Sequence, residues 1–199
     1  MDEVILARHG ESEFSLRGLA NGDPTVSVSL TGAGVDQARK LEERLRGEAI
    51  DLCVTTEFER TRQTADIALG GRDVPRLVIP ELNDIRFGEF EGGLVEGFRT
   101  WLREHGAAGV PPGGGESRAE TAIRYATGYR KVANRPERLI LAIGHAVSVV
   151  YILKCARGDD PPLFLEGPPD YAVPFRLSKE ELSRAADRLE SWARERLAA

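Results

Sequence analysis

A run of apolar residues near the start of the chain ends abruptly in an arginine and a histidine. Residues 4–7 read Val-Ile-Leu-Ala without polar alternation, and Arg8, His9 and Gly10 follow directly. Such an uninterrupted run is typical of a strand that is buried on both faces of a parallel sheet. Because ligands of open parallel sheets bind beyond the carboxyl ends of the strands, the pattern predicts that Arg8 and His9 lie at a ligand site.

A second buried strand later in the chain is expected to end in the same way. Residues 139–143 are again apolar, and Gly144 and His145 follow them. Two buried strands that each lead into a histidine are difficult to explain by packing alone. His9 and His145 are therefore the first candidate site residues.

Strand-like and helix-like segments alternate along the rest of the chain. Further strands are expected at 50–54, at 74–79 and near Phe175. The expected helices lie between Thr31 and Gly47, between Thr56 and Gly70, over about 95–103, over about 116–133, from His145 to about 154, and over 182–197. Residues 13–29 are expected to form a long functional loop, and 110–115 the most mobile one. This alternation predicts an α/β fold with a mainly parallel central sheet, in one domain spanning 1–199.

Composition argues against several classes of partner. The net charge of -5 argues against nonspecific nucleic-acid binding. No apolar run approaches the roughly 18 residues of a membrane span, and no signal peptide is expected, which favours the cytoplasm. Cys53 and Cys155 lie in apolar stretches without metal-ligand spacing and are expected to be buried free thiols.

The candidate residues fit phosphoryl transfer to a histidine. The guanidinium groups of Arg8 and Arg60 are permanently charged forks that match phosphate oxygens. A histidine beside them acts as a covalent nucleophile when it is neutral, and nearby arginines favour the neutral form. A departing alkoxide needs a carboxylic acid to protonate it. Glu81 and Asp84 follow the strand expected at 74–79 and are the candidate acids. Asp84 is the preferred candidate, and Glu81 ranks below it.

Five blocks of the sequence resemble the histidine phosphatase superfamily, in its phosphoglycerate mutase-like branch. Residues 8–12 look like the Arg-His-Gly signature, and 30–38 are similar to the family's LTxxGxxQA segment. Residues 56–65 resemble the motif of the second arginine, which selects Arg60 over Arg62. Residues 82–92 resemble the segment that carries the acid, and Gly144 with His145 matches the second histidine. The blocks occur in family order across about residues 4–150.

The resemblance implies a three-layer α/β/α sandwich and a set of residue roles. His9 would be the nucleophile, Arg8, Arg60 and His145 would bind phosphate, and Asp84 would donate the proton. The resemblance implies neither a metal nor another cofactor. The implied partner is a small phosphomonoester, with no nucleic acid or membrane; the oligomeric state is not indicated.

Two positions depart from the family pattern. Asp84 stands where the family usually has glutamate, so this acid is one methylene shorter. Ser15 stands where the family has a phosphate-contacting asparagine, and its hydroxyl group can still donate one hydrogen bond. The remaining residues expected to bind or border the substrate are Glu11, Asn21, Gly22 and Glu116.

The sequence therefore predicts a phosphatase that hydrolyses phosphate monoesters through phosphorylated His9. One alternative is a phosphoglycerate mutase, which must keep its phosphoryl group in an enclosed, water-poor pocket. Only residues 93–113 are available as a covering segment after the acid, which favours hydrolysis. A second alternative, motivated by Asp84 and Ser15, is a catalytically inactive module that binds phosphorylated ligands.

Overall fold

The computed structural model describes residues 1–165, 167 and 169–199. Within these residues, five strands form a central sheet in the order β3-β2-β4-β1-β5. Four of them pair in parallel, and β5 lies antiparallel to β1 at the edge. The prediction of a mainly parallel sheet is therefore confirmed. The strands are β1 (Glu3–Arg8), β2 (Leu52–Thr55), β3 (Arg76–Val78), β4 (Leu139–Gly144) and β5 (Pro174–Ser178).

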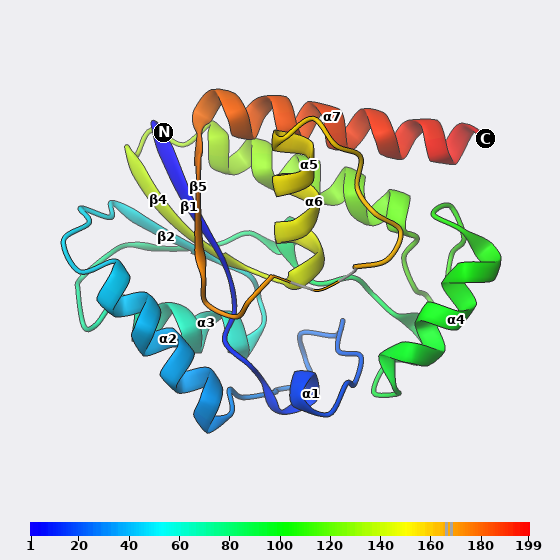
Figure 1. The fold of residues 1–199 in the computed structure, drawn as a ribbon, viewed down its shortest axis with the longest axis horizontal. Helices are drawn as coiled ribbons and strands as arrows, with labels where there is room; N and C mark the ends of the chain where they lie inside the picture. The colour runs from blue at the N-terminus through cyan, green and yellow to red at the C-terminus, as the bar shows by residue number, and fades with distance from the viewer. Residues whose placement is uncertain (166, 168) are drawn as a thin grey trace.

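Helices cover both faces of the sheet and complete three layers (Figure 1). One face is covered by α2 (Gly32–Arg44) and α3 (Glu59–Ala68). The other is covered by α5 (Arg118–Ala133), α6 (Ala146–Ala156) and α7 (Lys179–Ala198). The predicted three-layer α/β/α sandwich is confirmed.

The apolar run in β1 is explained by burial on both faces. Val4 and Leu6 pack among the residues of α5, α6 and α7. Ile5 and Ala7 point the other way and pack against α2 and α3. All four side chains are at most 1% exposed. A polar residue at any of these positions would face a dry core, so the strand shows no alternation.

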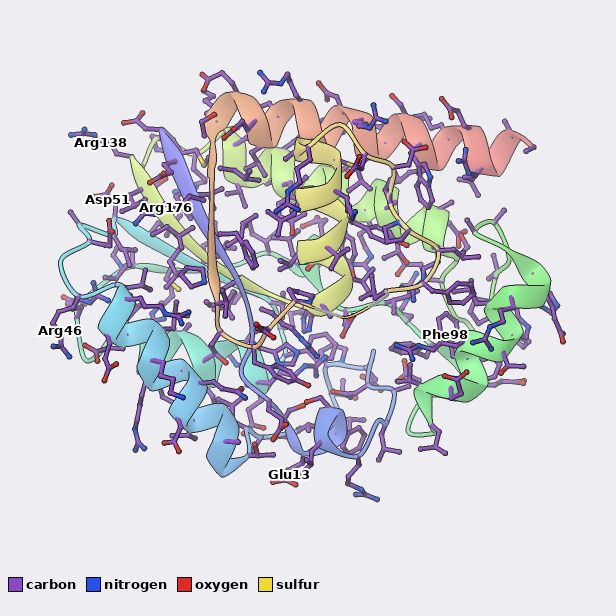
Figure 2. All side chains as sticks on the ribbon, in the orientation of Figure 1. Glu13, Arg46, Asp51, Phe98, Arg138 and Arg176 are labelled. Atoms are coloured by element: carbon purple, nitrogen blue, oxygen red, sulfur yellow. The ribbon has the colours of Figure 1, made fainter. Side chains whose placement is uncertain are left out.

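A smaller apolar cluster holds the loops beyond the carboxyl ends of the strands. It includes Phe98 and Leu102 of α4 (Val95–His105), together with Ala20 of the first long loop. Ile85 and Phe87 complete it from the segment between the turns of 3-10 helix η1 (Pro80–Leu82) and η2 (Gly88–Phe90). Figure 2 shows Phe98 on the inner side of α4, whereas charged side chains such as Arg138 lie at the periphery.

The long loop after β1 contains structure that the sequence did not indicate. A single helical turn, α1 (Glu13–Leu16), begins after Ser12, whose side chain accepts a hydrogen bond from the backbone of Ser15. Thr31 caps α2 as expected, because its Oγ1 accepts from Gly34 N at 3.0 Å. Among the described residues, no helix combines the length and apolar character that crossing a bilayer requires.

Candidate active site

The pairing of β1 with β4 brings the two predicted histidines together. Arg8 lies opposite Gly144 in the parallel register, and the backbone N–H of His9 donates to Gly144 O at 3.0 Å. The imidazole rings of His9 and His145 are 5.3 Å apart between their centroids. Residues separated by more than 130 positions thus meet because each follows a strand at the same edge of the sheet.

Gly10 allows α2 and α3 to approach the end of β1 closely. Its N–H donates to Thr64 Oγ1 of α3 at 2.9 Å. A Cβ at Gly10 would lie 2.5 Å from Gly34 O of α2, and a Cβ at Gly34 would lie 2.0 Å from Glu11 O. Both positions therefore need glycine, and the close approach fixes the backbone that carries His9.

Arg60, in the first turn of α3, is the centre of the hydrogen-bond network. Its side chain is 4% exposed. Nε donates to His9 Nε2 at 3.1 Å, and Nη2 lies 3.1 Å from Asp84 Oδ2 and 3.2 Å from His145 Nδ1. Nη1 donates to Asn21 Oδ1. One guanidinium group therefore contacts three of the predicted catalytic side chains.

These contacts determine which ring nitrogen carries the proton in each neutral histidine. His9 Nδ1 lies 2.7 Å from Gly10 O, which only accepts, so Nδ1 is protonated and Nε2 keeps its lone pair. In His145 the lone pair is on Nδ1, because this atom faces the N–H of Arg60. His145 Nε2 then donates to Thr56 Oγ1, 3.0 Å away.

Burial keeps both imidazole rings uncharged. It lowers the pKa of His9 and of His145 well below the usual value, and the positive charge of Arg60 lowers each pKa further. Both rings are therefore neutral near pH 7. A neutral His9 with its lone pair on Nε2 has the electronic form that a histidine nucleophile requires.

The lowered pKa values predict that the protein loses stability in mild acid. Unfolded histidine titrates near about pH 6.5, so below that pH the unfolded chain binds protons that buried His9 and His145 exclude. The contribution is absent above this pH, and the free energy of unfolding should fall by about 1 kcal/mol per histidine from about pH 6.5 to about pH 5.5. Urea titrations at several pH values measure this slope. His9→Gln and His145→Gln should each remove about half of it.

Arg8, the last residue of β1, lies against Tyr171. Its side chain is buried, and Nη1 donates to Pro169 O at 3.1 Å. The guanidinium carbon lies 3.8 Å from the centre of the Tyr171 ring. This stacking fixes the plane of the guanidinium group and leaves its edge available for an anion.

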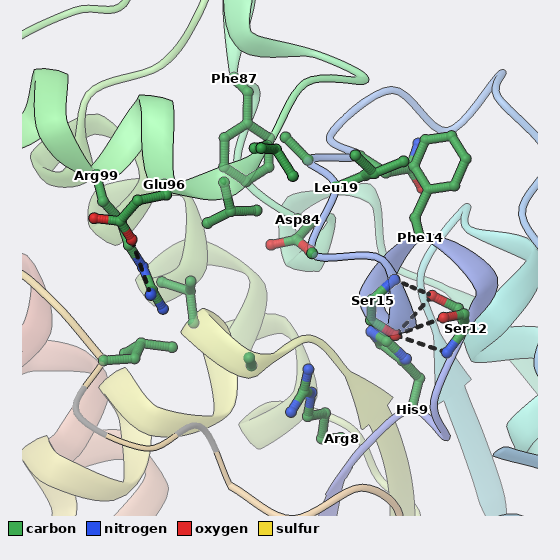
Figure 3. Close-up of a pocket in the computed structure, with 18 of the residues that line it drawn as sticks. Arg8, His9, Ser12, Phe14, Ser15, Leu19, Asp84, Phe87, Glu96 and Arg99 are labelled. Atoms are coloured by element: carbon green, nitrogen blue, oxygen red, sulfur yellow. Dashed lines mark hydrogen bonds and ion pairs between the residues drawn. The ribbon is translucent and has the colours of Figure 1, made fainter. Parts of the chain in front are cut away.

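A cavity of about 460 Å³ opens over His9 and accommodates a small molecule (Figure 3), whereas fully buried His145 is not among its lining residues. Its polar floor includes Arg8, His9, Arg60 and Asp84. Much of the remaining wall is apolar, and comes from Phe14, Leu19, Phe87, Leu94, Val95, Val147, Phe164 and Leu165. Among the described residues, no group of three or more His, Cys, Asp or Glu side chains has a metal-binding arrangement.

Two further residues predicted to bind substrate line this cavity, Ser15 and Asn21. The hydroxyl group of Ser15 is already engaged at the start of α1, where it accepts from Ser12 N at 2.7 Å and donates to Ser12 O at 2.9 Å. Asn21 holds Arg60 through both its side-chain and backbone oxygens. In this structure, Asn21 therefore contacts Arg60, and Ser15 contacts its own helix cap.

Glu11, Gly22 and Glu116 are not among the residues that line the cavity. The carboxylate of Glu11 accepts from Thr31 Oγ1 at 2.8 Å. Gly22 allows a close approach, since a Cβ there would lie 1.9 Å from Ile85 O. Buried Glu116 pairs with Arg124 at 2.6 Å. Their local contacts hold the loops that surround the cavity.

Sequence reasoning missed several residues that support or line the site. Thr56 and Thr64 lie four positions before and after Arg60. Thr56 contacts the ring of His145, and Thr64 accepts a hydrogen bond from the backbone of Gly10. Glu91 joins two loops by accepting from Gly22 N at 2.8 Å and Phe87 N at 2.9 Å. Arg118 lines the cavity at the start of α5. The spacing of the threonines around Arg60 was a usable signal, whereas the other contacts join distant segments.

Comparison with known proteins identifies the family. The model of the histidine phosphatase superfamily, branch 1, matches residues 4–195. The alpha-ribazole phosphatase of Shigella flexneri has a similar fold, with a TM-score of 0.76 and 24% sequence identity over 87% of this chain and 89% of that chain. At this identity the likeness concerns the fold.

Two curated relatives differ in the activity that their names state. The adenosylcobalamin/alpha-ribazole phosphatase of Salmonella typhimurium is 45% identical over 86 residues, which are 43% of this chain and 42% of that protein. The 2,3-bisphosphoglycerate-dependent phosphoglycerate mutase of a Methylobacterium species is 34% identical over 137 residues, 61% of this chain and 62% of the relative. The matched segments thus span less than two thirds of either relative. The family model, in contrast, covers nearly the whole chain, which therefore belongs to branch 1 of the histidine phosphatase superfamily.

Proposed function

We propose that this protein is a phosphatase that hydrolyses phosphate monoesters of small metabolites through a phosphohistidine intermediate on His9. The observation that carries the proposal is the state of His9. Its ring is neutral, Nδ1 is held by Gly10 O, and Nε2 presents a lone pair beside the guanidinium group of Arg60. The cytoplasm is the proposed location, in agreement with the free thiols of Cys53 and Cys155.

In the proposed first step, Nε2 of His9 attacks the phosphorus atom and the ester P–O bond breaks. Arg8 and Arg60 donate hydrogen bonds to the phosphate oxygens, and Arg60 exchanges its contacts with His9 and Asp84 for them. The negative charge of the substrate favours uptake of a proton from solvent on His145 Nδ1. This nitrogen then exchanges its contact with Arg60 for a phosphate oxygen, and it returns the proton to solvent when phosphate leaves. Asp84, as the general acid, transfers a proton to the departing alkoxide.

In the second step a water molecule attacks the phosphohistidine. The Asp84 carboxylate accepts a proton from this water, the N–P bond breaks, and inorganic phosphate and neutral His9 are regenerated. Asp84 is suitably placed for both transfers, because its Oδ2 lies 3.1 Å from Arg60 Nη2 and 3.4 Å from His145 Nδ1. No metal takes part in either proposed step.

Release of inorganic phosphate from p-nitrophenyl phosphate and from a panel of metabolite monoesters tests the proposal. We expect turnover with several members, ranked by kcat/KM. Tight binding of phosphorylated ligands without release from any ester would contradict it and favour the binding module.

The mutase remains a second candidate because of the relative that carries this name. The covering segment is one helix, α4, and the cavity is open enough to admit water. Incubation with 3-phosphoglycerate, with and without a bisphosphoglycerate primer, separates the two functions. A phosphatase gives glycerate and phosphate regardless of primer, whereas a mutase gives 2-phosphoglycerate only after priming.

Asp84→Asn should discriminate between substrates according to their leaving group. Asparagine keeps the size of the side chain but has no acidic proton to transfer, so alkyl phosphates should lose about 10²–10⁴-fold in kcat. An aryl phosphate with a good leaving group, such as p-nitrophenyl phosphate, should lose less than about tenfold in its first step.

Glu81→Gln is the matched control for this prediction. Glu81 lies three residues earlier, pairs with Lys131 at 2.5 Å and is not among the residues that line the cavity. We expect kcat to remain within about twofold for both kinds of ester. Because Asp84 also acts in the second step, which all esters share, the comparison uses the first step alone, measured as the burst of released alcohol or phenol. Equal losses of this burst rate on alkyl and aryl substrates in Asp84→Asn would remove Asp84 from the role of acid.

A further inference from the structure

Arg118 is a buried cation whose surroundings do not balance its charge. It is the first residue of α5, after the cap Ser117, and is 6% exposed. Its Nε and Nη1 atoms are fully buried and have no hydrogen-bond partner among the described residues. The aromatic ring of Phe98 is 5.4 Å from its guanidinium carbon. A cation–π contact at this distance offsets only part of the cost of removing the charge from water.

The position of Arg118 in the helix adds to this cost. The N-terminus of an α-helix carries a partial positive charge, which disfavours a cation in the first turn. In the part of the chain that the structure describes, the hydroxyl groups of Tyr125 and Tyr151 also have no hydrogen-bond partner. Burial raises the pKa of both, and the positive charge of Arg118 opposes this rise. A water molecule at these donors would accept hydrogen bonds but would bring no negative charge. Packing therefore gives no reason for an arginine here.

Arg118 lines the same cavity as Arg8 and His9. Arg99 also lines this cavity, but its side chain is 41% exposed and pairs with Glu96 at 3.5 Å (Figure 3). Arg118 differs from Arg99 in both respects. A guanidinium group that is buried, has no ionic partner within residues 1–165, 167 and 169–199, and is open to a ligand cavity is arranged to receive an anion from that cavity.

We propose that Arg118 is a specificity-determining residue that binds a second anionic group of the substrate, a carboxylate or a phosphate, while Arg8 and Arg60 hold the phosphate that is hydrolysed. This inference rests on the proposed phosphatase function and narrows its substrate class. The preferred substrates are monoesters whose organic part carries a further acid group, and the apolar wall contacts the carbon skeleton between the two anions.

Matched pairs of esters test this proposal. 4-Carboxyphenyl phosphate and 1,4-phenylene bisphosphate are compared with phenyl phosphate, and 3-phosphoglycerate with glycerol 3-phosphate. In Arg118→Met we expect kcat/KM for the acid-bearing esters to fall about 10- to 100-fold, the range of a charge-assisted hydrogen bond. The plain esters should change less than about threefold. The two aromatic probes distinguish a carboxylate from a phosphate as the preferred second anion.

Stability provides a readout that separates recognition from packing. Because Arg118→Met removes an unbalanced buried charge, its melting temperature should equal or exceed that of the wild type. Arg118→Lys keeps the charge without the planar fork and should retain part of the preference. Arg130→Met is the matched control, since this arginine of the same helix pairs with Asp187 at 2.8 Å outside the cavity. It should leave the preference unchanged.

The outcomes distinguish this proposal from the one on which it rests. If the wild type hydrolyses none of the esters, the phosphatase function fails. If it hydrolyses them and Arg118→Met lowers no acid-bearing member relative to its plain partner, the assignment of Arg118 is wrong. A uniform loss on all esters together with a lower melting temperature would instead make Arg118 a structural residue.

Discussion

His9→Ala is expected to reduce phosphate release from any monoester by at least about 10⁴-fold in kcat. The reason is that His9 carries the one imidazole among the described residues that line the cavity. His145 keeps a lone pair on Nδ1, but this atom faces Arg60 and lies next to Asp84. The imidazole of His9 is held by Gly10 O, so its Nε2 is directed toward the phosphate site. Removing the ring leaves the arginines to bind phosphate without a group that attacks it.

Trapping the intermediate measures this prediction directly. A ³²P-labelled ester is mixed with enzyme and quenched in alkali, in which phosphohistidine is stable. We expect label on the wild type and none on His9→Ala, while His145→Ala should still be labelled at a lower rate. His105→Ala is the matched control, because the third histidine is exposed and stacks on Trp101. Label that persists in His9→Ala and disappears in His145→Ala would assign the nucleophile to His145.

The sequence predicted those parts of the fold that depend on local pattern. The apolar runs of β1 and β4 predicted burial on both faces of the sheet, because every residue of such a strand contacts the core. Since parallel strands place their carboxyl ends at one edge, the same two runs predicted that His9 and His145 meet. Thr31 predicted the start of α2 for an equally local reason, because its hydroxyl group caps the first turn of that helix.

Contacts between distant segments could not be predicted in the same way. Tyr171 stacks on Arg8 only because the chain returns along β5 beside β1. Arg118 follows a turn-rich loop, and nothing in its neighbours indicates that its side chain enters the cavity. Ser15 shows that a suitable residue type does not by itself predict a contact. Its residue type suits a phosphate contact, yet its hydroxyl group is engaged with the backbone of Ser12.

Arg60 connects the predicted acid, Asp84, to the first long loop. Asn21 and Asp84 come from separate loops, and both accept hydrogen bonds from its guanidinium group. Glu91 joins these two loops by binding Gly22 N and Phe87 N. The Arg60 side chain is therefore held in place before substrate binds, so that little reorganisation is needed in the transition state.

Arg60→Ala should therefore lower kcat/KM by at least about 10²–10³-fold, the usual effect of removing one preorganised donor from such a site. A second consequence follows from charge. Because Arg60 lowers the pKa of both His9 and His145, its removal should raise these pKa values. The residual activity should consequently decline at a higher pH on the acidic side than wild-type activity does, since more of His9 is protonated there.

Arg62→Ala is the control that isolates this effect, because Arg62 lies on the same helix two residues later and is exposed. It should stay within about twofold of the wild type at every pH. Arg60→Lys restores the charge without the fork that reaches His9, Asn21 and Asp84 together, so it should recover only part of the rate. If Arg60→Ala and Arg62→Ala lose activity equally, or if the acidic limb of the pH profile does not move, Arg60 does not govern the charge state of His9. Burial alone would then account for the neutral form of the nucleophile.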